Sequence, residues 1–176
     1  MLSRDTLLVR HGQYDQATGE LNAKGIRDSE LAAEDVIYEG LGASALILSS
    51  DEARTLGTAK IIADELSSIK PVIPSPRIRE GGNSPYAVED LDQWIETALD
   101  EAGASLEGTH GLIVVTHEPL IGIAKQAIHG SKHVPYGFVM QYVLGSWENP
   151  HFLADKAQRL DMGIRELYRP QGSNTE

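Results

Sequence analysis

The chain has 176 residues, of which 41% are hydrophobic and 23% are charged, and it contains no cysteine. A chain of this length and composition can form one globular domain with a sizeable core. The absence of cysteine excludes a disulfide framework, a thiol nucleophile and a thiolate metal site. The formal net charge of −11 at pH 7 argues against binding to nucleic acid or to an anionic membrane surface.

The first residues lack a basic segment followed by a long apolar stretch, so no secretory signal is expected. No apolar run approaches the roughly 20 residues of a membrane span. We therefore expect a cytoplasmic protein with one domain over residues 1–169 and a loose polar tail over residues 170–176. The sequence does not indicate an oligomeric state.

Apolar runs rich in β-branched residues predict strands, and segments with apolar residues three or four positions apart predict helices. Asn22 is the expected N-cap of the first helix. The expected elements, in chain order, are a strand over 6–9, a helix over 23–38, a strand over 45–48, a helix from Ser50 or Asp51 to about Leu66, an extended segment over 71–74, a helix from Ser84-Pro85 to Gly103, a strand over 112–115, a helix from Pro119 to about Ile128, a strand over 138–144 and a last helix within 149–169.

Strands that alternate with helices indicate an α/β fold. The first strands are continuously apolar, as strands buried on both faces are. We therefore expect a three-layer sandwich, in which helices flank a mostly parallel central sheet on both sides. Ligands in such folds bind beyond the carboxyl ends of the strands. His11 and His117 each stand two residues beyond the end of a predicted strand, so one active site is expected to contain both.

The residues at these strand ends fit phosphoryl transfer. His11 is a neutral nucleophile near pH 7 and needs no metal to attack phosphorus. Arg10 and Arg54 offer planar N–H forks for phosphoryl oxygens, and His117 can donate to the same oxygens. Glu80 is the candidate acid for the leaving group. The alternatives are that Arg54 pairs with an acid on its own helix and that Glu80 is only solvated.

Four segments resemble motifs of the histidine phosphatase superfamily, which has the phosphoglycerate mutase-like fold. They occur in family order, each near a predicted junction of strand and helix, over roughly residues 6–124. These segments are VRHGQ at 9–13, LNAKG at 21–25, SSDEARTLGTA at 49–59 and VTHEP at 115–119.

This resemblance implies a phosphohistidine intermediate on His11 and a phosphate site completed by Arg10, Arg54 and His117. Gln13, Asn22 and Glu118 are further candidates for substrate contact, and no cofactor or metal is expected. The His-Glu-Pro sequence and the short span between Arg54 and His117 look most like the small phosphohistidine phosphatase branch. Glu80, by contrast, looks like the acid of other branches.

The expected function is a metal-independent phosphatase acting on a phosphorylated small molecule or a phosphoprotein. A mutase would normally carry a longer insertion, which favours hydrolysis. The alternatives are a catalytically weak phosphate-binding or scaffold protein of the same fold, or a phosphotransferase of the phosphoglycerate mutase type. No ligand spacing supports a metal-dependent hydrolase.

The sequence also departs from the family pattern. Asp51 and Glu52 stand where small or apolar residues are usual, and Glu118 adds an acid beside His117. Asn22 replaces a common threonine, and Gly57 replaces a glutamine-like residue. These differences concern the choice of substrate more than the binding of phosphate. The added acids suggest a cationic leaving group.

Overall fold

The structure is a computed structural model that describes residues 5–80, 91–121, 136–137, 139–143 and 165–166. Its centre is a six-stranded sheet in the order β3-β2-β4-β1-β5-β6. The strands are β1 (Asp5–Arg10), β2 (Leu46–Ser50), β3 (Ile73–Ser75), β4 (Leu112–Thr116), β5 (Val139–Val143) and β6 (Arg165–Glu166).

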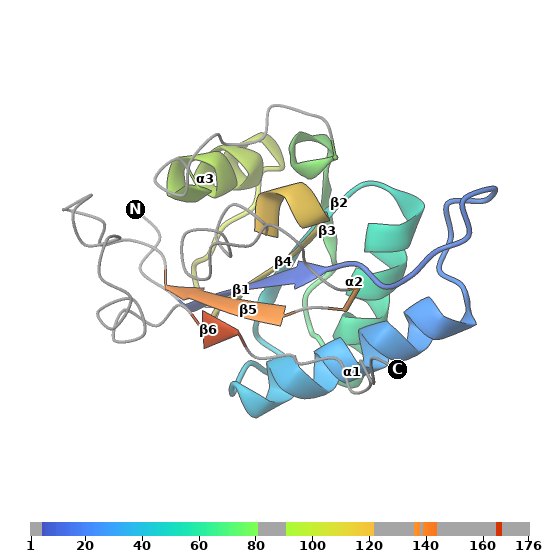
Figure 1. Ribbon diagram of the computed structural model, residues 1–176. Helices are drawn as coiled ribbons and strands as arrows, with labels where there is room; N and C mark the ends of the chain where they lie inside the picture. Colours follow the sequence, from blue (N-terminus) through green and yellow to red (C-terminus); the bar gives the residue numbers. More distant parts are fainter. Residues whose placement is uncertain (1–4, 81–90, 122–135, 138, 144–164, 167–176) are drawn as a thin grey trace.

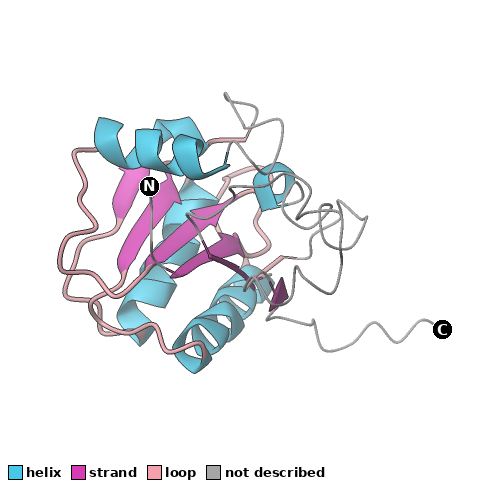
Figure 2. Ribbon diagram, turned by 90° about the vertical axis from the view of Figure 1, so that its left-hand side faces the viewer, coloured by secondary structure: helices cyan, strands magenta, loops and turns pink. Residues whose placement is uncertain are grey.

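Helices lie on both faces of this sheet (Figures 1 and 2). They are α1 (Ala23–Tyr38), α2 (Ala53–Glu65), α3 (Leu91–Glu101) and the short 3-10 helix η1 (Pro76–Ile78). Residues 118–121 are also helical. In Figure 1, α3 lies above the sheet and α1 lies below it. The three-layer α/β prediction is confirmed. None of the described helices is long and apolar enough to cross a membrane.

The sheet is mostly parallel because β1, β2, β3 and β4 run in the same direction. β5 pairs with β1 antiparallel, and β6 pairs with β5 antiparallel. Every residue of β2 and β4 is buried, which explains why the apolar residues at 46–48 and 112–115 form continuous runs rather than alternating with polar ones. Parallel strands end at a common edge, so the segments that follow β1, β2 and β4 meet there.

The first helix follows its sequence signals closely. The Asn22 side chain accepts a hydrogen bond from the backbone N–H of Gly25 at 2.9 Å, which caps α1. Ala32, Ala33 and Val36 are fully buried against the sheet layer. Gly40 has a φ of +81°, a left-handed conformation that favours glycine after a helix end. The predicted bounds of this helix are confirmed.

The predicted start of the second helix is wrong by two to three residues. Ser50 belongs to β2, where it pairs with Ser75 of β3, and α2 begins at Ala53. Glu52 occupies the N-cap position, but its carboxylate makes no cap hydrogen bond. The hydroxyl of Thr55 instead donates to the carbonyls of Ser50 and Glu52. Strand pairing thus extends β2 beyond the apolar run that predicted it.

The predicted last helix is contradicted where the chain is described. Arg165 and Glu166 form β6, with Gln141 opposite Arg165 and Met140 opposite Glu166. Pairing with the edge strand β5 determines this segment rather than its local pattern. The rest of residues 149–169, the helix start at 84–85, the helix end near 128 and the tail lie outside the described residues.

Candidate active site

The two histidines that follow predicted strands are neighbours in space. β1 and β4 pair in parallel with Arg10 opposite Thr116, and the backbone N–H of His11 donates to the Thr116 carbonyl at 3.1 Å. The ring centroids of His11 and His117 are 5.1 Å apart. Both residues are buried. The two side chains thus lie together at one edge of the sheet, and their membership of one active site stays a prediction.

The ring of His11 is fixed in one tautomer. Its Nδ1 lies 2.8 Å from the carbonyl oxygen of Gly12, and because a carbonyl only accepts, Nδ1 carries the proton. The lone pair of Nε2 is then available for attack on an electrophile. Burial is the main cause that lowers the pKa of His11 to about 4, and the positive charges of Arg54 and Arg10 lower it further. The ring is therefore neutral at pH 7.

His117 has the opposite tautomer. Its Nδ1 lies 3.5 Å from Nη2 of Arg54, which can only donate, so the proton is on Nε2. Nε2 faces Ser50 Oγ at 3.1 Å and Glu52 Oε2 at 2.5 Å. Burial lowers the pKa of His117 to about 3, with smaller contributions from His11, Arg54 and Arg10. His117 thus holds an N–H donor beside the proposed nucleophile.

Both predicted arginines lie at the site and are largely buried. Nη2 of Arg10 is 3.1 Å from Glu118 Oε2. Nη2 of Arg54 is 3.0 Å from Glu80 Oε2 and 3.2 Å from Glu52 Oε2. The Arg54 Nε atom is buried and has no hydrogen-bond partner within the described part of the chain. A buried donor of this kind fits an incoming anion.

Two tyrosines that sequence reasoning missed flank the nucleophile. The ring centroids of Tyr14 and Tyr136 lie 5.4 and 5.6 Å from that of His11. The Arg54 guanidinium lies 4.6 Å from the Tyr14 ring centroid, and that of Arg10 lies 4.0 Å from the Tyr136 centroid. The rings help to hold the arginines by cation–π contact. Tyr14 is near the motif in sequence, but nothing local could have pointed to Tyr136.

A buried hydrogen-bond network supports the nucleophile from below. Thr58 Oγ1 accepts from the backbone N–H of Gly12 at 3.0 Å and donates to the Arg54 carbonyl at 3.0 Å. It also lies 3.0 Å from the hydroxyl of Ser29. We call His11, Gly12, Ser29 and Thr58 the site floor. Thr58 follows Arg54 by one helical turn, which is the only sequence signal that could have found it.

The loop after β1 packs tightly on the start of α1. A Cβ added to Gly12 would lie 2.1 Å from the carbonyl oxygen of Gly25, so this position has no room for a side chain. The backbone carbonyl of Gln13 accepts from the N–H of Asn22 at 3.1 Å, while the Asn22 side chain caps α1. These contacts hold the loop against the helix. Substrate contact by Gln13 and Asn22 stays a prediction.

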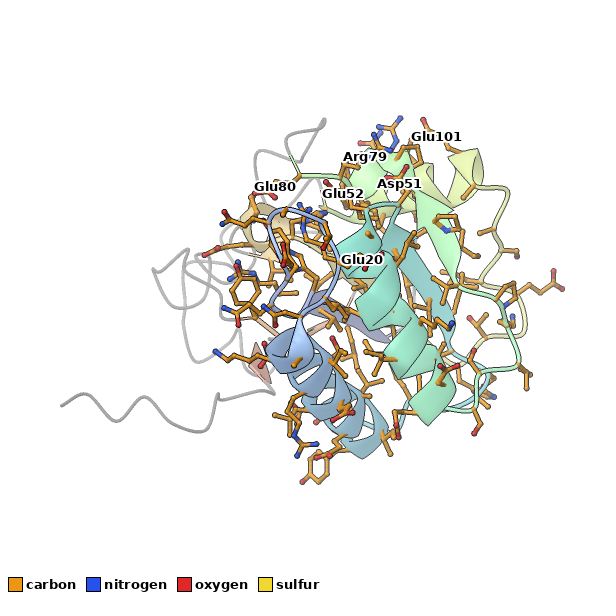
Figure 3. The ribbon with its side chains drawn as sticks, turned by 90° about the vertical axis from the view of Figure 1, so that its right-hand side faces the viewer. Glu20, Asp51, Glu52, Arg79, Glu80 and Glu101 are labelled. Atoms are coloured by element: carbon orange, nitrogen blue, oxygen red, sulfur yellow. The ribbon has the colours of Figure 1, made fainter. Side chains whose placement is uncertain are left out.

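Glu80 and Glu118, the two predicted acids, contact the site arginines, and Glu52 joins them from the N-cap of α2. Their side chains are 52%, 33% and 28% exposed, compared with 13% for Arg54 and 10% for Arg10. The carboxylates therefore lie outside the arginines, toward solvent. We call Glu52, Glu80 and Glu118 the acidic rim. Figure 3 shows Glu52 and Glu80 at the same end of the molecule, above the start of α2.

Among the residues that the structure describes, no group of three or more histidine, aspartate or glutamate side chains could hold a metal ion. The chemistry that the site supports depends on a buried neutral histidine with a free Nε2, a second histidine that donates, and two arginine forks. This combination fits attack on phosphorus and stabilisation of phosphoryl oxygens.

Sequence comparison gives one family match. The model of the histidine phosphatase superfamily (branch 1) matches residues 6–87. This range contains His11, Arg54 and Glu80 and ends before His117. No curated protein matches the sequence significantly.

Structural comparison finds the same fold in several phosphatases. The protein histidine phosphatase SixA complexed with tungstate has a TM-score of 0.60 at 17% identity, over 93% of this chain and 94% of that one. A mycobacterial glucosyl-3-phosphoglycerate phosphatase has a TM-score of 0.56 at 20% identity, over 93% and 95%. A phosphohistidine phosphatase SixA homologue from Agrobacterium tumefaciens has 0.54 at 18%, over 79% and 90%. At these identities the likeness concerns the fold.

Proposed function

We propose that this chain, a member of the histidine phosphatase superfamily, is a metal-independent phosphatase that works through a phosphohistidine on His11. The observation that carries the proposal is the ring of His11, which is buried and neutral, donates through Nδ1 to Gly12 and presents Nε2 beside His117. The substrate is a phosphorylated small molecule or phosphoprotein. The names of the similar structures include both a protein phosphatase and a phosphatase of a small molecule.

In the first step, Nε2 of His11 attacks phosphorus while the bond from phosphorus to the leaving oxygen breaks. The new N–P bond gives the imidazole a positive charge, which the Nδ1–H hydrogen bond to the Gly12 carbonyl stabilises. Arg10 and Arg54 stabilise the charge on the phosphoryl oxygens. His117 adds its Nε2–H when a phosphoryl oxygen replaces the Glu52 carboxylate at that atom.

The leaving oxygen takes the bonding electron pair and needs a proton. Glu80 is the proposed acid because its half-exposed carboxylate lies 3.0 Å from Nη2 of Arg54, beside the position where that arginine would hold phosphate. There it takes the proton of the phosphate monoanion and passes it to the leaving oxygen. Water then attacks phosphorus, the N–P bond breaks and Glu80 takes a proton from the water. Inorganic phosphate leaves and His11 returns to its neutral form.

The test uses p-nitrophenyl phosphate in the presence of EDTA, with radiolabelled substrate and an alkaline quench to trap the intermediate. We expect turnover that EDTA does not affect and label on His11 that is acid-labile and base-stable. His11→Ala should lower turnover by at least about 10³-fold. The matched control is His110→Ala. His110 is exposed and lies before the first residue of β4, whereas His117 follows the last residue of that strand. That variant should keep wild-type turnover.

Each other outcome supports a different function. Phosphate binding without turnover would indicate a scaffold protein. Transfer of the label to a second substrate molecule rather than to water would indicate a phosphotransferase. Turnover that EDTA abolishes would overturn the proposed mechanism.

A further inference from the structure

The carboxylate of Glu52 contacts two of the groups that the proposed function assigns to phosphate. Its Oε2 lies 2.5 Å from Nε2 of His117 and 3.2 Å from Nη2 of Arg54. His117 is neutral at pH 7, because burial lowers its pKa to about 3, and it carries its proton on Nε2. A guanidinium group only donates, so one carboxylate oxygen accepts from both groups. The two donors therefore define a position for one anionic oxygen.

The place of Glu52 at the start of α2 explains why its carboxylate is available for this contact. Glu52 occupies the N-cap position, but its side chain makes no hydrogen bond to the backbone N–H groups of the helix. Aspartate is among the preferred N-cap residues, because its shorter side chain reaches the N–H of the second or third helical residue. The glutamate side chain is one carbon longer, and its carboxylate contacts Arg54 and His117 instead.

Glu80 also contacts Arg54 but does not take the same position. Its Oε2 lies 3.0 Å from Nη2 of Arg54 and 3.8 Å from Nδ1 of His117, the ring nitrogen that carries no proton. The Glu80 side chain is also more exposed than that of Glu52. Within the described part of the chain, Glu52 is thus the acid that accepts the N–H of His117.

A phosphoryl oxygen and the Glu52 carboxylate cannot occupy this position at the same time. Phosphate that binds both donors has to displace the carboxylate, at the cost of two hydrogen bonds to a charged acceptor. His117 keeps an acceptor during the exchange, because Ser50 Oγ lies 3.1 Å from its Nε2. Phosphate offsets part of the cost, since its other oxygens can accept from donors that Glu52 does not use, such as the buried Nε of Arg54.

We propose that Glu52 is a displaceable internal ligand of the phosphate site, which competes with substrate and product for His117 and Arg54 and weakens the binding of both. This inference rests on the proposed function, because it assigns phosphate to the same two donors. The carboxylate moves toward solvent when substrate binds and returns when inorganic phosphate leaves. No covalent bond forms or breaks in this exchange, so Glu52 acts on affinity and limits inhibition by the product.

The test measures binding of inorganic phosphate by isothermal titration calorimetry at pH 7, which needs no turnover. Glu52→Asp is the decisive variant, because it keeps the negative charge while the shorter side chain withdraws from His117 and suits the N-cap. We expect its dissociation constant for phosphate to be at least about tenfold lower than that of the wild type, since the charged competitor is gone.

Two further variants separate direct competition from repulsion between charges. Glu52→Gln keeps the length of the side chain and should also tighten phosphate binding, because a neutral amide is a weaker acceptor than a carboxylate. Glu101→Gln is the matched control for the loss of one negative charge, because Glu101 is exposed and pairs with Arg77 outside the site. That variant should bind phosphate like the wild type. Urea unfolding checks that all three variants fold.

Proton NMR with isotope-labelled histidine follows the contact itself. A hydrogen bond to a carboxylate moves the Nε2–H signal of His117 further downfield than one to a hydroxyl group, because the charged acceptor binds the proton more strongly. We expect an upfield shift in Glu52→Asp, where Ser50 Oγ remains the acceptor, and its reversal when phosphate is added. The same signal position in the wild type and in Glu52→Asp would overturn the inference.

Failure of the inference is distinguishable from failure of the proposed function. Equal phosphate affinity of the wild type and Glu52→Asp would overturn the internal ligand, even where p-nitrophenyl phosphate is hydrolysed. Tighter binding in Glu52→Gln alone would overturn it as well, because charge repulsion would then explain the effect. Tighter binding in Glu52→Asp, in a protein that hydrolyses no ester, would support the internal ligand and overturn the phosphatase. Phosphate binding by none of these proteins would overturn both.

Discussion

The site floor and the acidic rim both contact Arg54, but they are built differently. The floor is buried, and neutral hydrogen bonds between backbone and hydroxyl groups hold it, as at Thr58 and Gly12. The rim is partly exposed, and ion pairs of Glu52, Glu80 and Glu118 hold it. Buried hydrogen bonds fix one geometry, whereas exposed ion pairs exchange easily. The floor therefore suits the positioning of a nucleophile, and the rim suits the exchange of one ligand for another.

The largest expected effect comes from crowding the floor. In Gly12→Ala the new Cβ would lie 2.1 Å from the Gly25 carbonyl oxygen and 2.8 Å from Ser29 Oγ, so the loop or α1 has to move. We expect a loss of about 3 kcal/mol in the free energy of unfolding, measured with urea, together with loss of turnover. Gly42→Ala is the control because nothing lies within 4 Å of its Cβ. A Gly12→Ala variant of wild-type stability would show that the floor is adaptable.

The next effect comes from Thr58→Val, which keeps the shape of the side chain but removes the acceptor of the Gly12 N–H. Leaving that buried donor without a partner costs about 1–3 kcal/mol. We expect kcat to fall about tenfold with little change in KM, because the nucleophile is less well positioned while the arginines remain. Thr58→Ser retains the hydroxyl and should recover most of kcat. A Ser variant as poor as the Val variant would point to packing instead.

Lowering the pH should destabilise the folded protein through its two buried histidines. His11 and His117 have pKa values of about 4 and 3 in the folded protein, against about 6.5 for an unperturbed histidine. Between these values the unfolded chain binds more protons than the folded one, so stability falls as the pH is lowered through this window.

The histidine contribution can be measured by difference. When the pH is lowered from about 7 to about 5, the free energy of unfolding should fall by about 1–2 kcal/mol more in the wild type than in His11→Asn. Urea unfolding of both proteins at the two pH values measures it, and other titrating groups cancel in the comparison. The same pH dependence in both proteins would contradict a neutral, buried His11.

The smallest expected effect is that of salt, which should weaken the charge interactions of the rim and leave the buried hydrogen bonds of the floor unchanged. Raising the ionic strength from about 0.1 M to about 1 M shortens the Debye length from about 10 Å to about 3 Å. We expect kcat/KM of the wild type for p-nitrophenyl phosphate to rise, because salt screens the repulsion between the anionic substrate and a chain with a formal net charge of −11. The kcat ratio of wild type to Thr58→Val should stay constant. Steady-state kinetics at both salt concentrations measure both quantities, and a kcat/KM that falls as salt rises would contradict the repulsion.

Much of the fold follows from local patterns. The continuous apolar runs before Arg10 and His117 require strands buried on both faces, and α1 keeps its predicted bounds because Asn22 and Gly40 mark its ends. The errors occur where pairing overrides the pattern. Ser50 extends β2 against Ser75, and residues 165–166 pair with β5 instead of forming a helix.

The sequence by itself determined which strands are buried and that His11 and His117 end two of them, because burial and strand ends follow local periodicity and the edge geometry of parallel sheets. Only the tertiary structure decided which distant residues contact these histidines and the loop that follows β1. The contact of Glu52 with His117, the flanking position of Tyr136 and the support of Gly12 by Thr58 join residues 46 to 125 positions apart. Hydrogen bonds and ring contacts over such separations depend on how α1 and α2 pack on the sheet, and no local pattern encodes that packing.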